Sequence, residues 1–98
     1  MNDTFTHHMN EIDRFAKERN WGRYHSPKNL SMALAVEAAE LMELYQWVGP
    51  DGEPDIHAVQ DEIADVMIYA LRLCSVLGIS PGFAITRKME KNKIKYPA

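Results

Sequence analysis

Four acidic residues in the middle of the chain form two pairs with the same spacing. Glu37 and Glu40 are three residues apart, and so are Glu62 and Asp65. Residues i and i+3 of an α-helix are neighbours on one face, so each pair can present two carboxylates in one direction. Carboxylate oxygens are ligands that hard cations such as Mg²⁺ or Mn²⁺ prefer. The spacing therefore predicts a metal site built from these four residues.

Apolar residues surround both pairs on a helical wheel. At about 100° per residue, six apolar residues lie within about 60° of Glu37: Leu30, Ala33, Leu34, Leu41, Leu44 and Val48. Seven residues lie equally close to Glu62: Ala58, Val59, Val66, Tyr69, Leu73, Val76 and Leu77. A carboxylate removed from water is costly unless it is paired or bound to a metal. Pairing with buried basic residues is the alternative, but Arg72 is at the edge of its face and Lys28 is opposite Glu37.

One further acid lies close to the first pair. Glu43 follows Glu40 by three residues, but its wheel position is about 120° from Glu37. The position leaves three alternatives open: support of the metal ligands, action as a base, or exposure to solvent. We take Glu40 and Glu43 as the candidates for orienting a catalytic water.

The elements that must position these acids are helices. Pro and Gly divide the chain into four amphipathic segments, over residues 8–19, 27–48, 55–77 and 80–96. Ser26 and Ser80 each precede a proline and are expected to cap the second and fourth segments. No stretch shows the alternation of a β-strand. Short connections between long helices predict an all-α fold, a four-helix antiparallel bundle that forms one domain over residues 1–98.

Length and composition narrow the function classes. A domain of 98 residues buries a modest fraction of its surface and is often marginal alone, which leaves oligomerisation open. A net charge of −3 gives the chain no excess of positive charge with which to bind a nucleic acid polymer. A single cysteine excludes an internal disulfide. Because we find neither a signal peptide nor an apolar run long enough to span a membrane, we expect a cytoplasmic protein with no membrane partner.

At these residues the sequence resembles the MazG-like nucleotide pyrophosphohydrolases, and within them the dCTP pyrophosphatase branch. The acidic pairs read E-x-x-E and E-x-x-D, residues 21–29 read W-x-x-x-H-x-P-x-N, and the tail over 88–97 also matches. The resemblance implies an all-α fold, Mg²⁺ bound by Glu37, Glu40, Glu62 and Asp65, and assembly as homodimers or homotetramers. It also implies hydrolysis of a nucleoside triphosphate, dCTP or a modified dCTP, to the monophosphate and pyrophosphate, which would cleanse the nucleotide pool.

The resemblance also implies roles for seven residues outside the acidic pairs. Lys88, Asn92 and Tyr96 would hold the triphosphate, which their shared helix face and donor groups allow. Four residues would line the base and sugar pocket: Trp21, His25, Trp47 and Tyr69. Without the resemblance, the first three could form a solvated basic face, and the aromatic residues could serve a core or an interface. Many members carry two adjacent acids at the start of the motif, whereas Val36 precedes Glu37 in this chain.

Two other functions fit parts of the pattern. A di-iron bundle protein would need Glu-x-x-His motifs, and neither acidic pair has a histidine at that offset. A non-enzymatic helical interaction module, whose acids bind a partner's basic residues, would explain the amphipathic helices without a metal. It would not explain why the three residues at 88, 92 and 96 share one face.

Overall fold

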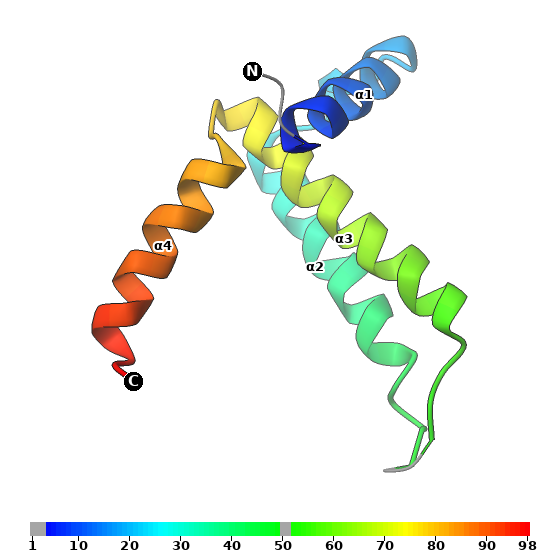
Figure 1. Cartoon of the computed structure of the whole chain (residues 1–98). Coiled ribbons are helices and arrows are strands. Elements are labelled where there is room, and N and C mark those ends of the chain that lie inside the picture. The colour runs from blue at the N-terminus through cyan, green and yellow to red at the C-terminus, as the bar shows by residue number, and fades with distance from the viewer. Residues whose placement is uncertain (1–3, 50–51) are drawn as a thin grey trace.

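The computed structural model describes residues 4–49 and 52–98, and helices dominate these ranges (Figure 1). The elements follow in the order α1 (Thr4–Glu18), the short 3-10 helix η1 (Gly22–Tyr24), α2 (Pro27–Glu43), α3 (Ile56–Leu77) and α4 (Pro81–Lys95). No strand occurs within the described ranges. The predicted all-α fold class is confirmed.

Local chemistry fixes several helix ends where the sequence predicts them. The Ser26 hydroxyl accepts a hydrogen bond from the backbone N–H of Asn29 at 3.1 Å, and Ser80 accepts one from Phe83 at 3.4 Å. These contacts satisfy N–H groups that have no partner within the helix. Gly78 ends α3 with φ of 69°, in the left-handed region that favours glycine.

Other helix bounds differ from the prediction. The first helix starts at Thr4 rather than at residue 8, and the second ends at Glu43 rather than near residue 48. The backbone amides of residues 44–46 donate to carbonyls three residues earlier, at 3.0–3.2 Å, so the chain tightens into turns after α2. The 3-10 helix η1 was not predicted.

The helices pack mainly through one antiparallel pair. Helices α2 and α3 run side by side in opposite directions, and α1 packs against α3 (Figure 1). Four hydrophobic residues of the described ranges are buried: Ala16, Leu30, Val59 and Leu71. Helix α4 turns away from α3 by 101° and makes no comparably extensive contact with the other described elements. Within the described residues the antiparallel packing is thus confined to α2 and α3, and large apolar side chains of α4 stay exposed.

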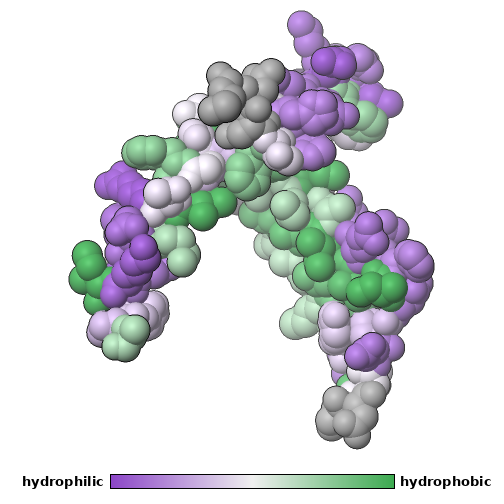
Figure 2. Space-filling view, viewed as in Figure 1, coloured by the Kyte–Doolittle hydropathy of each residue, from purple (hydrophilic) through white to green (hydrophobic). Residues whose placement is uncertain are grey.

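The single chain exposes more surface than a compact domain of its size. Its radius of gyration is 16.0 Å, against about 13 Å for a compact domain of about 100 residues. Large hydrophobic side chains are exposed on α2, α3 and α4, and Figure 2 shows green, hydrophobic residues running along the leg of the arch that α2 and α3 form. No single described helix is both long and apolar enough to cross a membrane; α3 and α4 pass that test only when joined across their bend.

Candidate metal centre and adjoining cavity

The packing of α2 against α3 brings the two acidic pairs together. Carboxylate oxygens of Glu37, Glu40 and Glu62 all lie within 4.8 Å of one another. Glu37 and Glu62 are half-buried between the helices, whereas Glu40 is exposed to solvent. Asp65 is half-buried one turn after Glu62, and its charge acts on Glu37. The four residues predicted as metal ligands therefore share one region of the α2·α3 interface, which we call the carboxylate cluster.

No basic side chain neutralises the carboxylate cluster within the described part of the chain. None of the ion pairs found there includes a member of the cluster. The Oε2 atoms of Glu37 and Glu62 are buried and have no hydrogen-bond partner. Arg72, the basic residue closest to this face in the sequence analysis, pairs with Asp13 instead. Buried acceptors of this kind are costly unless a donor or a cation reaches them.

Mutual repulsion perturbs the carboxylates. A hydrogen bond with Glu40, burial, and the charges of Glu40, Asp65 and Glu62 together raise the pKa of Glu37 to about 7. Burial raises the pKa of Glu62 above its ordinary value, and the charge of Glu40 acts in the same direction. A bound cation would favour the charged form of both carboxylates and so oppose both shifts.

The donor set of the cluster fits a hard divalent cation. All of its ligand atoms are carboxylate oxygens, and no histidine or cysteine belongs to the group within the described residues. Mg²⁺ and Mn²⁺ favour such oxygen ligands, whereas zinc and iron sites commonly include imidazole or thiolate. The unpartnered Oε2 atoms supply acceptors that a cation could satisfy.

A cavity of about 700 Å³ adjoins the cluster. It lies among α1, α3 and the segment around η1, and Trp21, His25, Asp65 and Tyr69 all contribute to its lining. Asp65 belongs both to this wall and to the charged environment of Glu37. Three of the four residues predicted to contact the base and sugar therefore line one cavity beside the carboxylates.

The end of α1 directs Trp21 and His25 into position. Asn20 adopts φ of 55°, and the next amide, of Trp21, donates to the Ala16 carbonyl at 2.9 Å. This left-handed ending reverses the chain after α1. The Trp21 ring then contacts the Phe15 ring edge-on, with centroids 5.4 Å apart, and lies 6.1 Å from the His25 ring.

The structure does not bring all the predicted site residues to the carboxylate cluster. Lys88 and Asn92 lie on α4, and Tyr96 caps its C-terminal end; this helix diverges from α2 and α3 (Figure 1). Trp47 lies in the turn after α2 with 88% of its surface exposed, and Glu43 is exposed at the last residue of α2. Within one chain these five residues do not converge on the carboxylate cluster, so their roles at the site stay predictions.

Basic residues on α4 contribute to a second, smaller cavity. It measures about 470 Å³ at the corner between α3 and α4, and Arg87, Lys88 and Lys91 line part of it. Its apolar wall includes Phe83. Lys88 thus belongs to a positively charged corner that a single chain leaves apart from the carboxylates.

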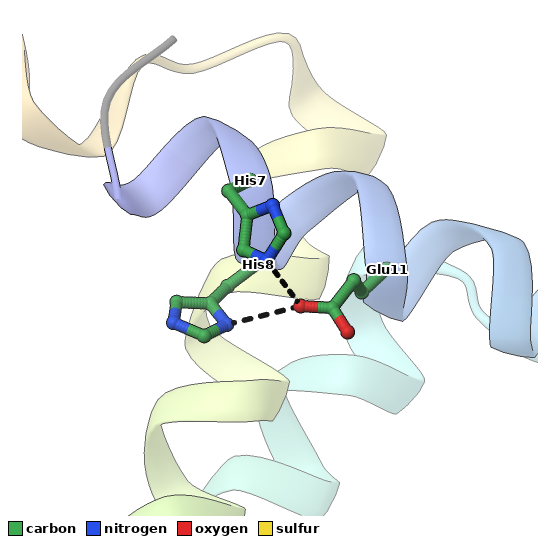
Figure 3. Close-up of side chains that lie close together, drawn as sticks. All are labelled: His7, His8 and Glu11. Atoms are coloured by element: carbon green, nitrogen blue, oxygen red, sulfur yellow. Dashed lines mark ion pairs between the residues drawn. The ribbon is translucent and has the colours of Figure 1, made fainter.

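An exposed polar cluster lies on the first turns of α1. Glu11 accepts contacts from His7 Nε2 at 2.9 Å and from His8 Nδ1 at 3.4 Å, as Figure 3 shows. All three residues are exposed. Their two imidazole nitrogens set this cluster apart from the all-oxygen carboxylate cluster.

Sequence reasoning missed one polar network. Arg72 Nε donates to His25 Nδ1 at 3.0 Å, and Arg72 Nη1 donates to Asp13 at 2.8 Å. The wheel position of Arg72, at the edge of the apolar face of α3, was the available signal. It could not identify the partners, which are 47 and 59 residues away in the chain.

Comparisons with known proteins agree with this geometry. The family model described as MazG-like matches residues 32–98. The human and bovine proteins named dCTP pyrophosphatase 1 are 40% and 38% identical to the chain in alignments of 92 and 91 residues, which cover 86% and 85% of this chain. The chain spans about half of their lengths, 54% and 53%. The crystal structure of a pyrophosphatase from Archaeoglobus fulgidus DSM 4304 matches with a TM-score of 0.87 at 38% identity, over 100% of this chain and 96% of that one.

Proposed function

The chain belongs to the MazG-like family, and from this premise we propose that it hydrolyses a nucleoside triphosphate to the monophosphate and pyrophosphate. The observation that carries the proposal is the carboxylate cluster, which has no basic partner and adjoins an aromatic-lined cavity. The names of the mammalian relatives favour dCTP or a modified dCTP as the substrate. Hydrolysis of such nucleotides would cleanse the nucleotide pool.

The cation that fits the site is Mg²⁺, with Mn²⁺ as a substitute. Glu37, Glu40, Glu62 and Asp65 would hold it: oxygens of the first three converge, Oε2 of Glu37 and of Glu62 lacks a partner, and the charge of Asp65 acts on Glu37. When bound, the cation would neutralise the phosphates and polarise the phosphorus under attack. The carboxylates themselves would set its position.

The reaction needs a water at the α-phosphorus. Glu40 is the better candidate to orient it, because its carboxylate belongs to the cluster and yet is exposed to solvent. Glu43 is exposed outside the group of converging oxygens, so it is the weaker candidate. The water oxygen would bond to the α-phosphorus, a water proton would pass to the carboxylate, and the bond to the leaving pyrophosphate would break.

The aromatic cavity is the proposed site for the nucleoside. Trp21 offers a ring face for stacking, and Tyr69 and His25 add polar groups to the same wall. Because Asp65 is shared between wall and cluster, a nucleoside in the cavity would direct its phosphates toward the carboxylates.

A second copy of the chain is the proposed partner that completes the site. The accessible surface of one chain is 7802 Å², whereas about 5,700 Å² is expected for a compact monomer of this mass. The excess is comparable to the area that an obligate dimer buries. A homodimer or homotetramer would cover the apolar residues of α4 and could bring Lys88, Asn92, Tyr96 and Trp47 to the triphosphate and the base.

The test is release of pyrophosphate from canonical and modified dNTPs and NTPs, with Mg²⁺ and with EDTA. Hydrolysis in H₂¹⁸O locates the attack, because the label enters the nucleoside monophosphate only if water attacks the α-phosphorus. We expect metal-dependent release, label in the monophosphate and preference for cytosine nucleotides.

The other outcomes separate the parts of the proposal. Metal-dependent release with another preference would keep the reaction and discard dCTP as the substrate. Label in the pyrophosphate would refute attack at the α-phosphorus. Silence across the panel from a folded sample would favour the helical interaction module, whose acids would bind a partner's basic residues.

A further inference from the structure

Arg72 connects three parts of the wall of the aromatic cavity. It projects from α3, and its side chain is only 15% exposed. The guanidinium donates from Nη1 to Asp13 of α1 at 2.8 Å and from Nε to Nδ1 of His25, after η1, at 3.0 Å. Two donors of a planar fork thus hold two separate elements at fixed positions.

The contact decides which nitrogen of His25 carries the ring proton. Arginine has only donors, so Nδ1 must accept and therefore carries no proton. A neutral imidazole with an unprotonated Nδ1 has its proton on Nε2. Burial and the charge of Arg72 lower the pKa of His25, in agreement with a neutral ring. None of the hydrogen bonds found among the described residues uses Nε2, so this N–H group can meet a ligand in the cavity that His25 lines.

We propose that Arg72 is a positioning residue that holds His25 as an Nε2–H donor at the cavity wall, so that the site selects nucleosides presenting a neutral oxygen or nitrogen acceptor there. This inference rests on the proposed function, because it takes the cavity as the nucleoside site. A histidine free to invert its tautomer could offer an acceptor to the ligand instead, and the selection would be lost.

Trp21 supports the assignment of a ligand role to this donor. Its ring lies 6.1 Å from His25 and lines the same cavity, so a base stacked on the indole would have its edge near the imidazole. Stacking tolerates any base, whereas a fixed donor discriminates among base edges. Trp21 would therefore supply affinity for the base, and His25 would select among base edges.

The first measurement is the tautomer of His25 in the full chain, by long-range ¹H–¹⁵N NMR. We expect a protonated Nε2 and an unprotonated Nδ1 in the wild type, and a mixture of tautomers in Arg72→Met. Arg72→Lys keeps the charge but not the fork, so it should restore the preference only in part. A wild-type ring with its proton on Nδ1 would overturn the inference, whatever the activity.

The second measurement is the Kd of a non-hydrolysable α,β-imido analogue of dCTP with Mg²⁺. Loss of a hydrogen bond worth about 1 kcal/mol predicts about fivefold weaker binding to Arg72→Met. If Arg72 acts through His25, the double variant Arg72→Met/His25→Phe should bind no more weakly than His25→Phe alone. Additive losses would reveal a merely structural role and overturn the inference.

Kinetics distinguish this inference from the proposed function. We expect Arg72→Met to raise KM about fivefold while kcat changes little, because the contact affects ground state and transition state alike. If the wild type binds the analogue but releases no pyrophosphate, only the proposed reaction is contradicted. If the wild type is active and Arg72→Met binds the analogue as tightly as the wild type does, only the role of Arg72 is contradicted.

Discussion

Binding of Mg²⁺ to the carboxylate cluster should release protons in an amount that the structure sets. The pKa of Glu37 is raised to about 7 in the metal-free chain, by its hydrogen bond with Glu40 first and then by burial and neighbouring charge. Only the deprotonated carboxylate ligates the cation. At pH 7, where this residue is about half protonated, binding should release about 0.5 proton per site from Glu37. Release should fall toward zero near pH 8.5 and rise toward one near pH 5.5.

Calorimetry in buffers with different ionisation enthalpies measures this number, since released protons are absorbed by the buffer. The Glu37→Gln variant should lose most of the release at pH 7, because glutamine does not ionise, and should also bind Mg²⁺ more weakly. Glu18→Gln changes an exposed acid of α1 in the same way and should leave both quantities unchanged. Proton release that is absent at pH 7 in the wild type, with Mg²⁺ bound, would refute the reasoning about Glu37.

Three further predictions follow from the same geometry. In EDTA, the melting temperature of the wild type relative to Glu37→Gln should fall as pH rises from 5 to 8, because folded Glu37 keeps a proton that the unfolded chain loses above the ordinary pKa of 4.5. The lowered pKa of His25 has the opposite effect on stability, but it is present in both proteins and cancels in the comparison. A difference in melting temperature that stays constant with pH would contradict the prediction. Asp65→Asn should lower kcat/KM for pyrophosphate release by about 100-fold or more, as loss of a group that organises transition-state charge does. The control Asp61→Asn changes an exposed acid on the same helix and should alter kcat/KM little. Equal effects of the two substitutions would exclude a specific role for Asp65. Ile85→Lys on the exposed apolar surface of α4 should shift the oligomer toward monomer in sedimentation experiments. The control Thr86→Lys, at the adjacent exposed position, should not. An unchanged assembly in both variants would place the interface elsewhere.

Short-range chemistry explains the parts of the fold that the sequence predicted. Ser26 and Ser80 cap helices because their hydroxyls reach an amide only three residues ahead. The approach of Glu37 to Glu62 also followed from local information. Both lie on the apolar faces of consecutive helices, and a short connection makes such helices antiparallel neighbours.

The parts that the sequence did not predict depend on contacts between distant segments or between chains. An amphipathic pattern shows that α4 has an apolar face, but it does not show which surface covers that face. The 101° turn after α3 was therefore outside its reach. Likewise, Arg72 could have paired with several acids, and only the packing of α1 on α3 places Asp13 and His25 within 3.0 Å of it.

The arrangement of charges explains how the site could couple the cation to its substrate. Four carboxylates gather where no basic side chain of the described chain neutralises them, so the site repels a free triphosphate as well as its own members. The aromatic cavity next to them is mainly apolar and can accept a nucleoside without a cation. Asp65 belongs to both regions, so the phosphates of a nucleotide bound in the cavity would lie near the carboxylates. A cation bound there would replace the repulsion between carboxylates and phosphates by attraction of the phosphates to the cation. Hydrolysis would then require nucleoside and cation together, because neither the cavity nor the cluster alone favours a triphosphate.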